Sequence, residues 1–265
     1  MMSFDLTNRL AIVTGGSQGL GKATSLALAR AGADVVVAAR RPEAVTVGRS
    51  RPHEPVDPVV EEVTRLGRRS LGITADVRDE EQVESMVAQT MDAFGRIDIL
   101  VNVVGGSWGE TFRAGPLLEL APHDLLEAYR VNVLTMFQCS TAVVPIMKRQ
   151  GKGVIVNIAS EAGRGASPGQ AAYGAAKAAV INMSMSMAAE WGPEVRVNSI
   201  AIGGLETPHR PMWDAHRQES LGRSVLGRVG TPEEHAGTVV WLASDYAGYI
   251  TGAVIDAHGG GRRLA

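Results

Sequence analysis

Cysteine is nearly absent from this sequence, and the few histidines do not gather. Cys139 is the only cysteine in 265 residues, so an internal disulfide is excluded and we expect Cys139 to be inert packing. The six histidines show no metal-ligand spacing, so no metal site is predicted. An excess of positive charge is also missing, since the formal charge is −2 and the pI is near 6.3. This balance argues against nucleic acid or an anionic membrane as a partner.

Long apolar segments are missing as well. No stretch approaches the roughly eighteen consecutive apolar residues that a membrane-spanning helix needs. The first ten residues, MMSFDLTNRL, contain an acid and lack the apolar core of a signal peptide. We therefore expect a cytoplasmic protein without a membrane partner.

Short apolar runs alternate with segments of helical period. The predicted strands are 10–14, 34–39, 70–75, 98–103, 153–160, 195–200 and 253–257, and the predicted helices are 19–31, 80–94, about 124–149, 171–191 and 232–243. The strands lack polar alternation, so helices should cover both of their faces. This pattern predicts one α/β domain over residues 1–265, built on a doubly wound parallel sheet of about seven strands.

A glycine-rich run, TGGSQGLG (14–21), stands between the first strand and the first helix. In this architecture ligands bind beyond the carboxyl ends of the strands, and glycines there allow a tight turn and close approach to a pyrophosphate. An ordinary glycine-rich turn is the alternative, because the spacing departs from G-x-G-x-x-G. The predicted cofactor-binding residues of the loop are Gly15, Ser17, Gln18, Gly19, Leu20 and Gly21.

The end of the second strand indicates which dinucleotide binds. Ala39 stands where an NAD-binding protein usually has an acid, and Arg40 and Arg41 follow as guanidinium groups suited to a 2′-phosphate. NADP(H) is therefore the expected cofactor. The alternative is a solvated arginine pair at a strand end.

Three further residues form a candidate catalytic group. Tyr173 and Lys177 are four apart on a predicted helix, hence on one face, where an ammonium would lower the pKa of the tyrosine from about 10 toward neutrality. Ser160 closes the fifth strand at the edge that carries the glycine loop. These positions predict general acid catalysis by Tyr173, against the alternatives of a solvated helix face and a serine cap.

These residues, with other motifs in the same order, resemble the short-chain dehydrogenase/reductase family over nearly the whole chain. The matching motifs are TGGSQGLG, ADV (75–77), DILVN (98–102), RVN (130–132), Ser160, Tyr173, Lys177, RVNSI (196–200), ETP (206–208), LGRVGTPEE (226–234) and ITG (250–252). The resemblance implies a Rossmann-type fold, a nicotinamide cofactor and hydride exchange between a carbonyl and an alcohol.

The resemblance also implies roles for single residues. Tyr173 would protonate the carbonyl oxygen, Ser160 would bind that oxygen, and Lys177 would lower the tyrosine pKa and hold the nicotinamide ribose. Asn132 would hold a water that relays protons to Lys177. The remaining expected cofactor contacts are Asp76 and Val77 at the adenine, Thr207 at the nicotinamide amide or a phosphate, and Asn102, Gly105 and Gly203.

The chain departs from the family pattern in four places. Where the family commonly has NNAG, this chain has Asn102, Val103, Val104 and Gly105, and loss of the second Asn puts the support of the central strand in doubt. Ile202 precedes Gly203 where Pro-Gly is usual, and His258 replaces an Asp. An insertion of roughly eight to ten residues lies within 46–58, where prolines oppose helix and strand alike. It is either a surface loop or a cover over the adenosine.

The substrate pocket should be walled by residues 105–112 and by a mobile lid at about 205–225. The expected substrate-binding residues are Trp108, Glu161, Met212 and Trp213, with further surface from Phe112, His209 and Arg210. This mostly apolar set favours a medium-sized cyclic or aryl-bearing ketone over a sugar. Alternatively, the aromatic residues pack the lid onto the body.

Two classes of function fit these residues. The first is an NADP(H)-dependent oxidoreductase that interconverts a carbonyl and a secondary alcohol. The second is a noncatalytic dinucleotide sensor on the same fold. The family resemblance also implies a homo-oligomer, most simply a homotetramer, that pairs through the long fourth and fifth helices. Residues 181–191 (INMSMSMAAEW) give the fifth helix an apolar second half whose methionines adapt to irregular packing surfaces. Alternatively, these methionines face the monomer's own sheet.

Overall fold

The computed structural model describes residues 4–40, 54–106, 111–206 and 224–261. Within these ranges seven strands form one sheet in the order β3-β2-β1-β4-β5-β6-β7, with every pairing parallel. The strands are β1 (Leu10–Thr14), β2 (Asp34–Ala39), β3 (Ser70–Thr74), β4 (Ile99–Asn102), β5 (Gly153–Ser160), β6 (Val195–Ile202) and β7 (Val254–Ala257). The expected doubly wound sheet is confirmed.

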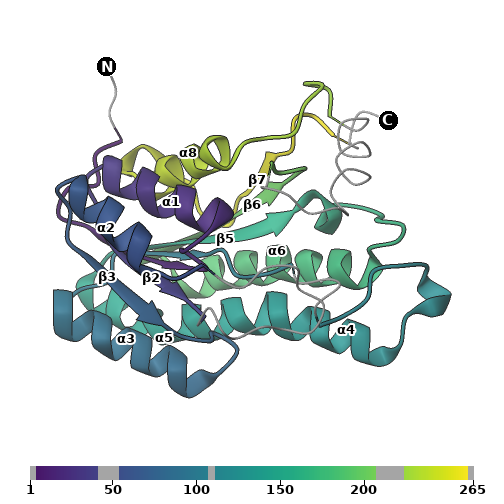
Figure 1. Ribbon diagram of the computed structural model, residues 1–265, viewed down its shortest axis with the longest axis horizontal. Helices are drawn as coiled ribbons and strands as arrows, with labels where there is room; N and C mark the ends of the chain where they lie inside the picture. The colour runs from purple at the N-terminus through teal and green to yellow at the C-terminus, as the bar shows by residue number, and fades with distance from the viewer. Residues whose placement is uncertain (1–3, 41–53, 107–110, 207–223, 262–265) are drawn as a thin grey trace.

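Helices cover the sheet on both faces (Figure 1). One layer holds α1 (Gly19–Arg30), α2 (Asp57–Arg65) and α8 (Pro232–Ala243), and the other holds α3 (Glu80–Phe94), α4 (Pro122–Tyr129), α5 (Thr135–Gln150) and α6 (Ala171–Trp191). Leu10 and Ile12 belong to the core cluster that includes α3, α5 and α6, whereas Ala11 and Val13 belong to the cluster that includes α1 and α8. Both faces of β1 are buried, which explains why the strand is apolar throughout.

Helix α2 corrects the boundary of the expected insertion. The prolines in 46–58 argued against a helix, yet α2 begins at Asp57 with Pro58 in its first turn. A proline is tolerated there because the N–H groups of the first turn have no intrahelical partner. Val59 and Val63 bury the inner face of α2. Residues 46–53 lie outside the described part of the chain.

The long helix expected at 124–149 is three segments. Helix α4 is followed by a π-helical turn, Arg130–Leu134, and then by α5. The chain is helical without a break over the expected range, but the sequence did not predict the π turn, because the apolar periodicity continues through it and does not reveal the extra residue. Asn132 lies within the π turn, a feature that often occurs at functional sites.

Polar side chains support the central strands although the second Asn of the family motif is absent. Asn102 Nδ2 donates to Asn157 Oδ1 at 2.8 Å and to Ser140 Oγ at 3.1 Å. Thr14 Oγ1 accepts from the backbone N–H of Val103 at 3.1 Å. These bonds join β1, β4 and β5 at their carboxyl ends, so the doubt about the central strand is resolved.

Candidate active site

A cavity of about 230 Å³ lies beyond the carboxyl ends of β1 and β4, where the strand order reverses. This switch point is where open parallel sheets bind nucleotides. Most of the residues expected to bind the cofactor line the cavity, namely Gly15, Ser17, Gln18, Gly19, Leu20, Gly21, Arg40, Asp76, Val77 and Gly105. The structure therefore brings together predicted residues from four separate segments of the chain.

The glycine loop has the backbone geometry of a phosphate cradle. Gly15 and Gly19 have φ values of +68° and +51°, a region that side chains with a β-carbon rarely adopt. A β-carbon on Gly21 would stand 1.9 Å from the carbonyl oxygen of Gly15. The N-cap of α1, Gln18, makes no side-chain cap hydrogen bond, and the first turn contains no acid. The backbone N–H groups of the glycine loop and of the first turn of α1 are therefore free of side-chain caps. Together with the positive end of the helix dipole they fit a pyrophosphate.

The adenosine side of the cavity contains an arginine that the sequence analysis missed. Arg78 Nε donates to both carboxylate oxygens of Asp76, at 2.9 and 3.0 Å, and Arg78 lines the cavity with Arg40. Burial raises the pKa of the Asp76 carboxyl, but the hydrogen bonds from Arg78 and the charges of Arg78 and Arg40 outweigh it and lower the pKa. The buried Thr111 Oγ1 also lines this cavity and has no partner among the described residues. A polar cofactor fits such a lining.

The candidate catalytic side chains converge at the adjoining edge. Ser160 ends β5, and Tyr173 and Lys177 lie in the first two turns of α6. All three residues are more than nine-tenths buried. Ser160 Oγ accepts from the backbone N–H of Ala162 at 3.2 Å, and the Ser160 hydroxyl hydrogen-bonds Tyr173. Lys177 Nζ donates to the carbonyl oxygen of Ile158 at 2.8 Å and lies 5.8 Å from the centroid of the Tyr173 ring.

Asn132 and Gly105 connect this group to the nucleotide cavity. Asn132 Oδ1 accepts from the backbone N–H of Gly106 at 2.7 Å, and its Nδ2 donates to the carbonyl oxygen of Ala128 at 2.9 Å. A β-carbon on Gly105 would stand 2.7 Å from Asn132 Oδ1 and 2.8 Å from Lys177 Nζ. Because Gly105 also lines the cavity, the catalytic side chains adjoin the predicted cofactor site.

The electrostatics of Tyr173 correct one expectation. Burial raises the pKa of Tyr173 to about 12, the hydrogen bond from Ser160 partly offsets this, and the Glu161 carboxylate raises the pKa further. Burial also lowers the pKa of Lys177 to about 8. The predicted depression of the tyrosine pKa by Lys177 is therefore wrong in this structure, because the cost of burying a phenolate exceeds the favourable contacts.

Other expected site residues lie elsewhere. The Asn102 side chain is engaged inside the sheet, and Gly203 lies against His258, whose Cβ is 2.7 Å from a β-carbon built on the glycine. Phe112 is 3% exposed and packs in the core cluster that also contains Tyr173. Predicted site residues outside the described part of the chain are Arg41, Trp108, Thr207, His209, Arg210, Met212 and Trp213. Of the predicted lid, the same holds for residues 207–223.

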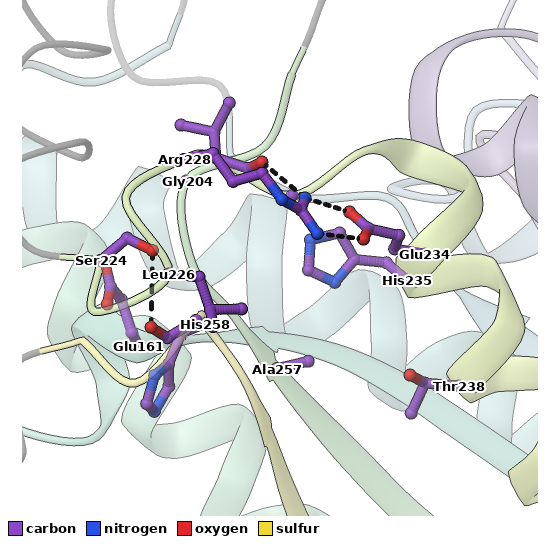
Figure 2. A pocket seen from close by; sticks show the side chains of 13 residues that line it. Glu161, Gly204, Ser224, Leu226, Arg228, Glu234, His235, Thr238, Ala257 and His258 are labelled. Carbon is purple, nitrogen blue, oxygen red and sulfur yellow. Dashed lines mark hydrogen bonds and ion pairs between the residues drawn. The ribbon is translucent and has the colours of Figure 1, made fainter.

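A second cavity, of about 170 Å³, lies at the carboxyl ends of β5, β6 and β7 (Figure 2). Glu161, Ser224 and His258 lie on one side of it, and Arg228, Glu234 and His235 on the other. Glu161 directly follows Ser160 in the sequence. Glu161, which was predicted to bind substrate, is thus next to the catalytic residue Ser160 and lines the second cavity rather than the nucleotide cavity.

Metal and membrane features are not found in the described residues. No group of three His, Cys, Asp or Glu side chains there could hold a metal ion. No helix in the described ranges is long and apolar enough to cross a membrane.

Comparison with known proteins agrees with this arrangement. A family model described as Enoyl-(Acyl carrier protein) reductase matches residues 15–261. The chain belongs to the short-chain dehydrogenase/reductase family. It is therefore a member of an oxidoreductase family, as its motifs indicated.

Three relatives cover nearly the whole chain. The (2S)-[(R)-hydroxy(phenyl)methyl]succinyl-CoA dehydrogenase subunit BbsD of Thauera aromatica is 39% identical over 260 residues, which is 96% of this chain and 97% of the relative. The solved 7 alpha-hydroxysteroid dehydrogenase complexed with NADH and 7-oxo glycochenodeoxycholic acid is 29% identical, with a TM-score of 0.85 over 98% of this chain and 96% of that one. The NADPH-dependent 3-quinuclidinone reductase of Rhodotorula rubra is 27% identical, with a TM-score of 0.86 over 99% and 94%.

Proposed function

We propose that the protein is an NADP(H)-dependent oxidoreductase that interconverts a carbonyl and a secondary alcohol, with Tyr173 as the general acid and base. One observation carries the proposal: Ser160, Tyr173 and Lys177 are buried together beside the glycine-loop cavity. A hydrogen-bonded tyrosine and a buried lysine beside a cavity lined by the glycine loop fit acid–base chemistry on a bound substrate.

The chain's own groups supply the proton in this reaction, and the bound nicotinamide supplies the hydride. In the reductive direction the Ser160 hydroxyl orients the carbonyl oxygen, and the Tyr173 hydroxyl donates its proton to that oxygen as charge develops. Lys177 would hold the nicotinamide ribose, and Asn132 fixes the loop at Gly105 and Gly106. The oxidative direction reverses each proton transfer.

The preference for NADP(H) rests on this chain rather than on its relatives. One solved relative is described with NADH and another as NADPH-dependent, so family membership leaves the choice open. In this chain Ala39 lines the cavity at the end of β2, where a carboxylate would repel a 2′-phosphate, and Arg40 lines the cavity next to it. Arg78 adds a second guanidinium group on the same side.

We infer a ring-bearing ketone as the substrate class. The names of the relatives include a hydroxy(phenyl)methyl group, a 7-oxo bile acid and 3-quinuclidinone. These names support the preference for a cyclic or aryl-bearing ketone that the apolar residues of the sequence suggested.

Turnover of ketones tests the proposal. Wild-type protein is assayed with NADPH against cyclohexanone, acetophenone and a 7-oxo bile acid, following NADPH absorbance. Tyr173→Phe is the matched control, because it removes only the hydroxyl; its rate should fall by about a hundredfold to ten-thousandfold while NADPH still binds. A Tyr173→Phe rate within tenfold of wild type would contradict the assigned role. Binding of NADPH without turnover of any ketone or alcohol would contradict enzyme function.

A further inference from the structure

The second cavity contains one carboxylate, that of Glu161, which no described residue neutralises. Glu161 is half-buried on the cavity wall, and its carboxylate has no hydrogen bond or ion pair within the described ranges. A partly buried carboxylate without a partner is unfavourable, because it loses water contacts and gains none in return. Such a group favours a positively charged ligand.

The other charged side chains that line the cavity in the described part of the chain are already paired. Arg228 donates to Glu234 at 2.7 and 2.5 Å, so this bidentate pair contributes no net charge (Figure 2). Burial lowers the pKa of His235, only partly offset by Glu234, so the His235 imidazole is neutral at pH 7. Among the described residues on this side of the cavity, no unpaired charge competes with Glu161 for a cation, although the neutral His235 has an unpartnered Nε2.

The acid nearest to His258 is paired as well. Arg164 Nε lies 3.1 Å from Asp256 Oδ1, and His258 Nε2 lies 3.7 Å from the same oxygen. The His258 imidazole is thus oriented toward Asp256 rather than toward Glu161. Ser224 faces the cavity beside Glu161, and its hydroxyl donates to the carbonyl oxygen of Gly259 at 3.4 Å, so its lone pairs remain available to a donor.

Glu161 is also electrostatically linked to the catalytic centre. It follows Ser160 in the chain, and its charge opposes ionisation of Tyr173. A cation beside Glu161 would cancel this opposition when Tyr173 gives up its proton. The cavity volume of about 170 Å³ is more than ten times the roughly 10–15 Å³ that one water needs, so an ammonium group fits.

We propose that this cavity is a subsite for a protonated amino group of the substrate, held by the Glu161 carboxylate, and that the enzyme acts on amino ketones and amino alcohols. The proposal rests on the proposed oxidoreductase function and deepens it. Binding the ammonium group there orients the carbinol or carbonyl carbon toward Ser160 and Tyr173.

A matched pair of alcohols tests the subsite. 4-Aminocyclohexanol and 4-methylcyclohexanol, as the same stereoisomer, have nearly equal shapes and differ by one charge. Wild type with NADP⁺ should show a kcat/KM for the amino alcohol at least about tenfold above that for the methyl compound, since a hydrogen bond between charged groups is worth that much or more. Glu161→Gln keeps the shape of the side chain and should reduce the ratio about tenfold. Glu190→Gln, which removes an exposed charge at the end of α6, should leave the ratio unchanged.

A binding measurement makes the result independent of turnover. Titration calorimetry with cyclohexylammonium chloride should give a dissociation constant about tenfold weaker for Glu161→Gln than for wild type. A wild-type ratio of one or less, or equal cyclohexylammonium binding in both proteins, would overturn the subsite. If cyclohexylammonium binding depends on Glu161 but no alcohol or ketone is turned over, the subsite holds and the proposed oxidoreductase function fails.

Discussion

Lys177 and Gly105 are in such close contact that a side chain at position 105 would displace the lysine ammonium group. The Lys177 ammonium nitrogen lies 2.8 Å from where a β-carbon on residue 105 would stand, and Asn132 Oδ1 lies 2.7 Å from the same point. Distances this short do not occur between a real β-carbon and its neighbours. The absence of a side chain at residue 105 therefore leaves room for Lys177 and Asn132 next to a residue that lines the nucleotide cavity.

Gly105→Ala should displace Lys177 and Asn132 and impair catalysis. A misplacement of about 1 Å near reacting groups can cost about a hundredfold in rate, so we expect kcat to fall at least tenfold, with weaker NADPH binding. Steady-state kinetics and a fluorescence titration with NADPH measure the two effects. Gly165→Ala is the matched control, since a β-carbon there meets nothing within 4 Å. A Gly105→Ala enzyme within twofold of wild type would show that the contact does not matter.

The buried lysine should make stability depend on pH in a defined direction. The pKa of Lys177 falls from its ordinary value of 10.5 to about 8 in the folded protein because of burial. Below pH 8 the lysine is charged in both states, and folding bears the full cost of burying that charge. Between pH 8 and 10.5 the unfolded chain holds a proton that the folded chain has released, so stability rises with pH.

Comparison with Lys177→Met isolates this contribution from other titrating groups. Urea unfolding of both proteins at pH 7 and 9.5 should show wild type gaining about 2 kcal/mol relative to Lys177→Met over this interval. Lys148→Met is the control, because Lys148 is exposed at the end of α5. A Lys177→Met difference that stays constant with pH would show that Lys177 is not the source of the rise.

Cofactor preference should reverse on a single substitution at the end of β2. Ala39 is 7% exposed and lines the nucleotide cavity beside Arg40. An aspartate there would accept from a ribose 2′-hydroxyl and repel a 2′-phosphate. Wild type should therefore bind NADPH at least tenfold more tightly than NADH, and Ala39→Asp should bind NADH more tightly.

Fluorescence titration with both dinucleotides measures the preference directly. Ser85→Asp, which adds a carboxylate on the exposed face of α3, is the control for net charge. Equal or tighter NADH binding by wild type would refute the NADP(H) assignment. An Ala39→Asp protein that keeps the NADPH preference would move the recognition to other residues.

The sequence predicted the boundaries of strands and helices well where one local pattern, such as an apolar run or an N-cap residue, determines them. The strands 10–14, 34–39 and 153–160 and the helices 80–94, 171–191 and 232–243 have the expected boundaries. Apolar runs buried on both faces identify the strands, and N-caps such as Asp79 and Thr231 mark where two of the helices begin. The sequence pattern did not predict helix α2, because proline usually opposes a helix. Pro58 lies in the first turn, where proline is tolerated.

The candidate site was harder to predict where three-dimensional burial decides the chemistry. The spacing of Tyr173 and Lys177 gave their shared helix face, but not the burial that raises the tyrosine pKa to about 12. Likewise, no local pattern shows that Phe112 enters the core or that Arg78 folds back onto Asp76. These features depend on contacts between segments that the sequence pattern does not specify.

An exposed apolar surface on α4 and α5 supports the proposed homo-oligomer. Leu126, Leu134 and Phe137 are 70%, 41% and 42% exposed, whereas Met187 is buried and Met183 packs against the core. The methionines of 181–191 thus mostly face the monomer's own sheet, apart from Met185 at 41% exposure. We therefore place the expected pairing surface mainly on α4 and α5.

Phe137→Glu should separate the subunits, because it puts a charge into an interface that must be apolar to be stable. Light scattering at micromolar concentration should give a multiple of the 27.9 kDa chain mass for wild type and a smaller mass for the variant. Leu66→Glu is the matched control, since Leu66 is 40% exposed next to α2 in the opposite helix layer. Its mass should equal that of wild type. A monomeric wild type would refute oligomerisation, and an unchanged mass for Phe137→Glu would locate the contact on another surface.

Because α4, the π turn and α5 also position Asn132, loss of pairing should lower kcat as well, and this loss should appear in Phe137→Glu alone.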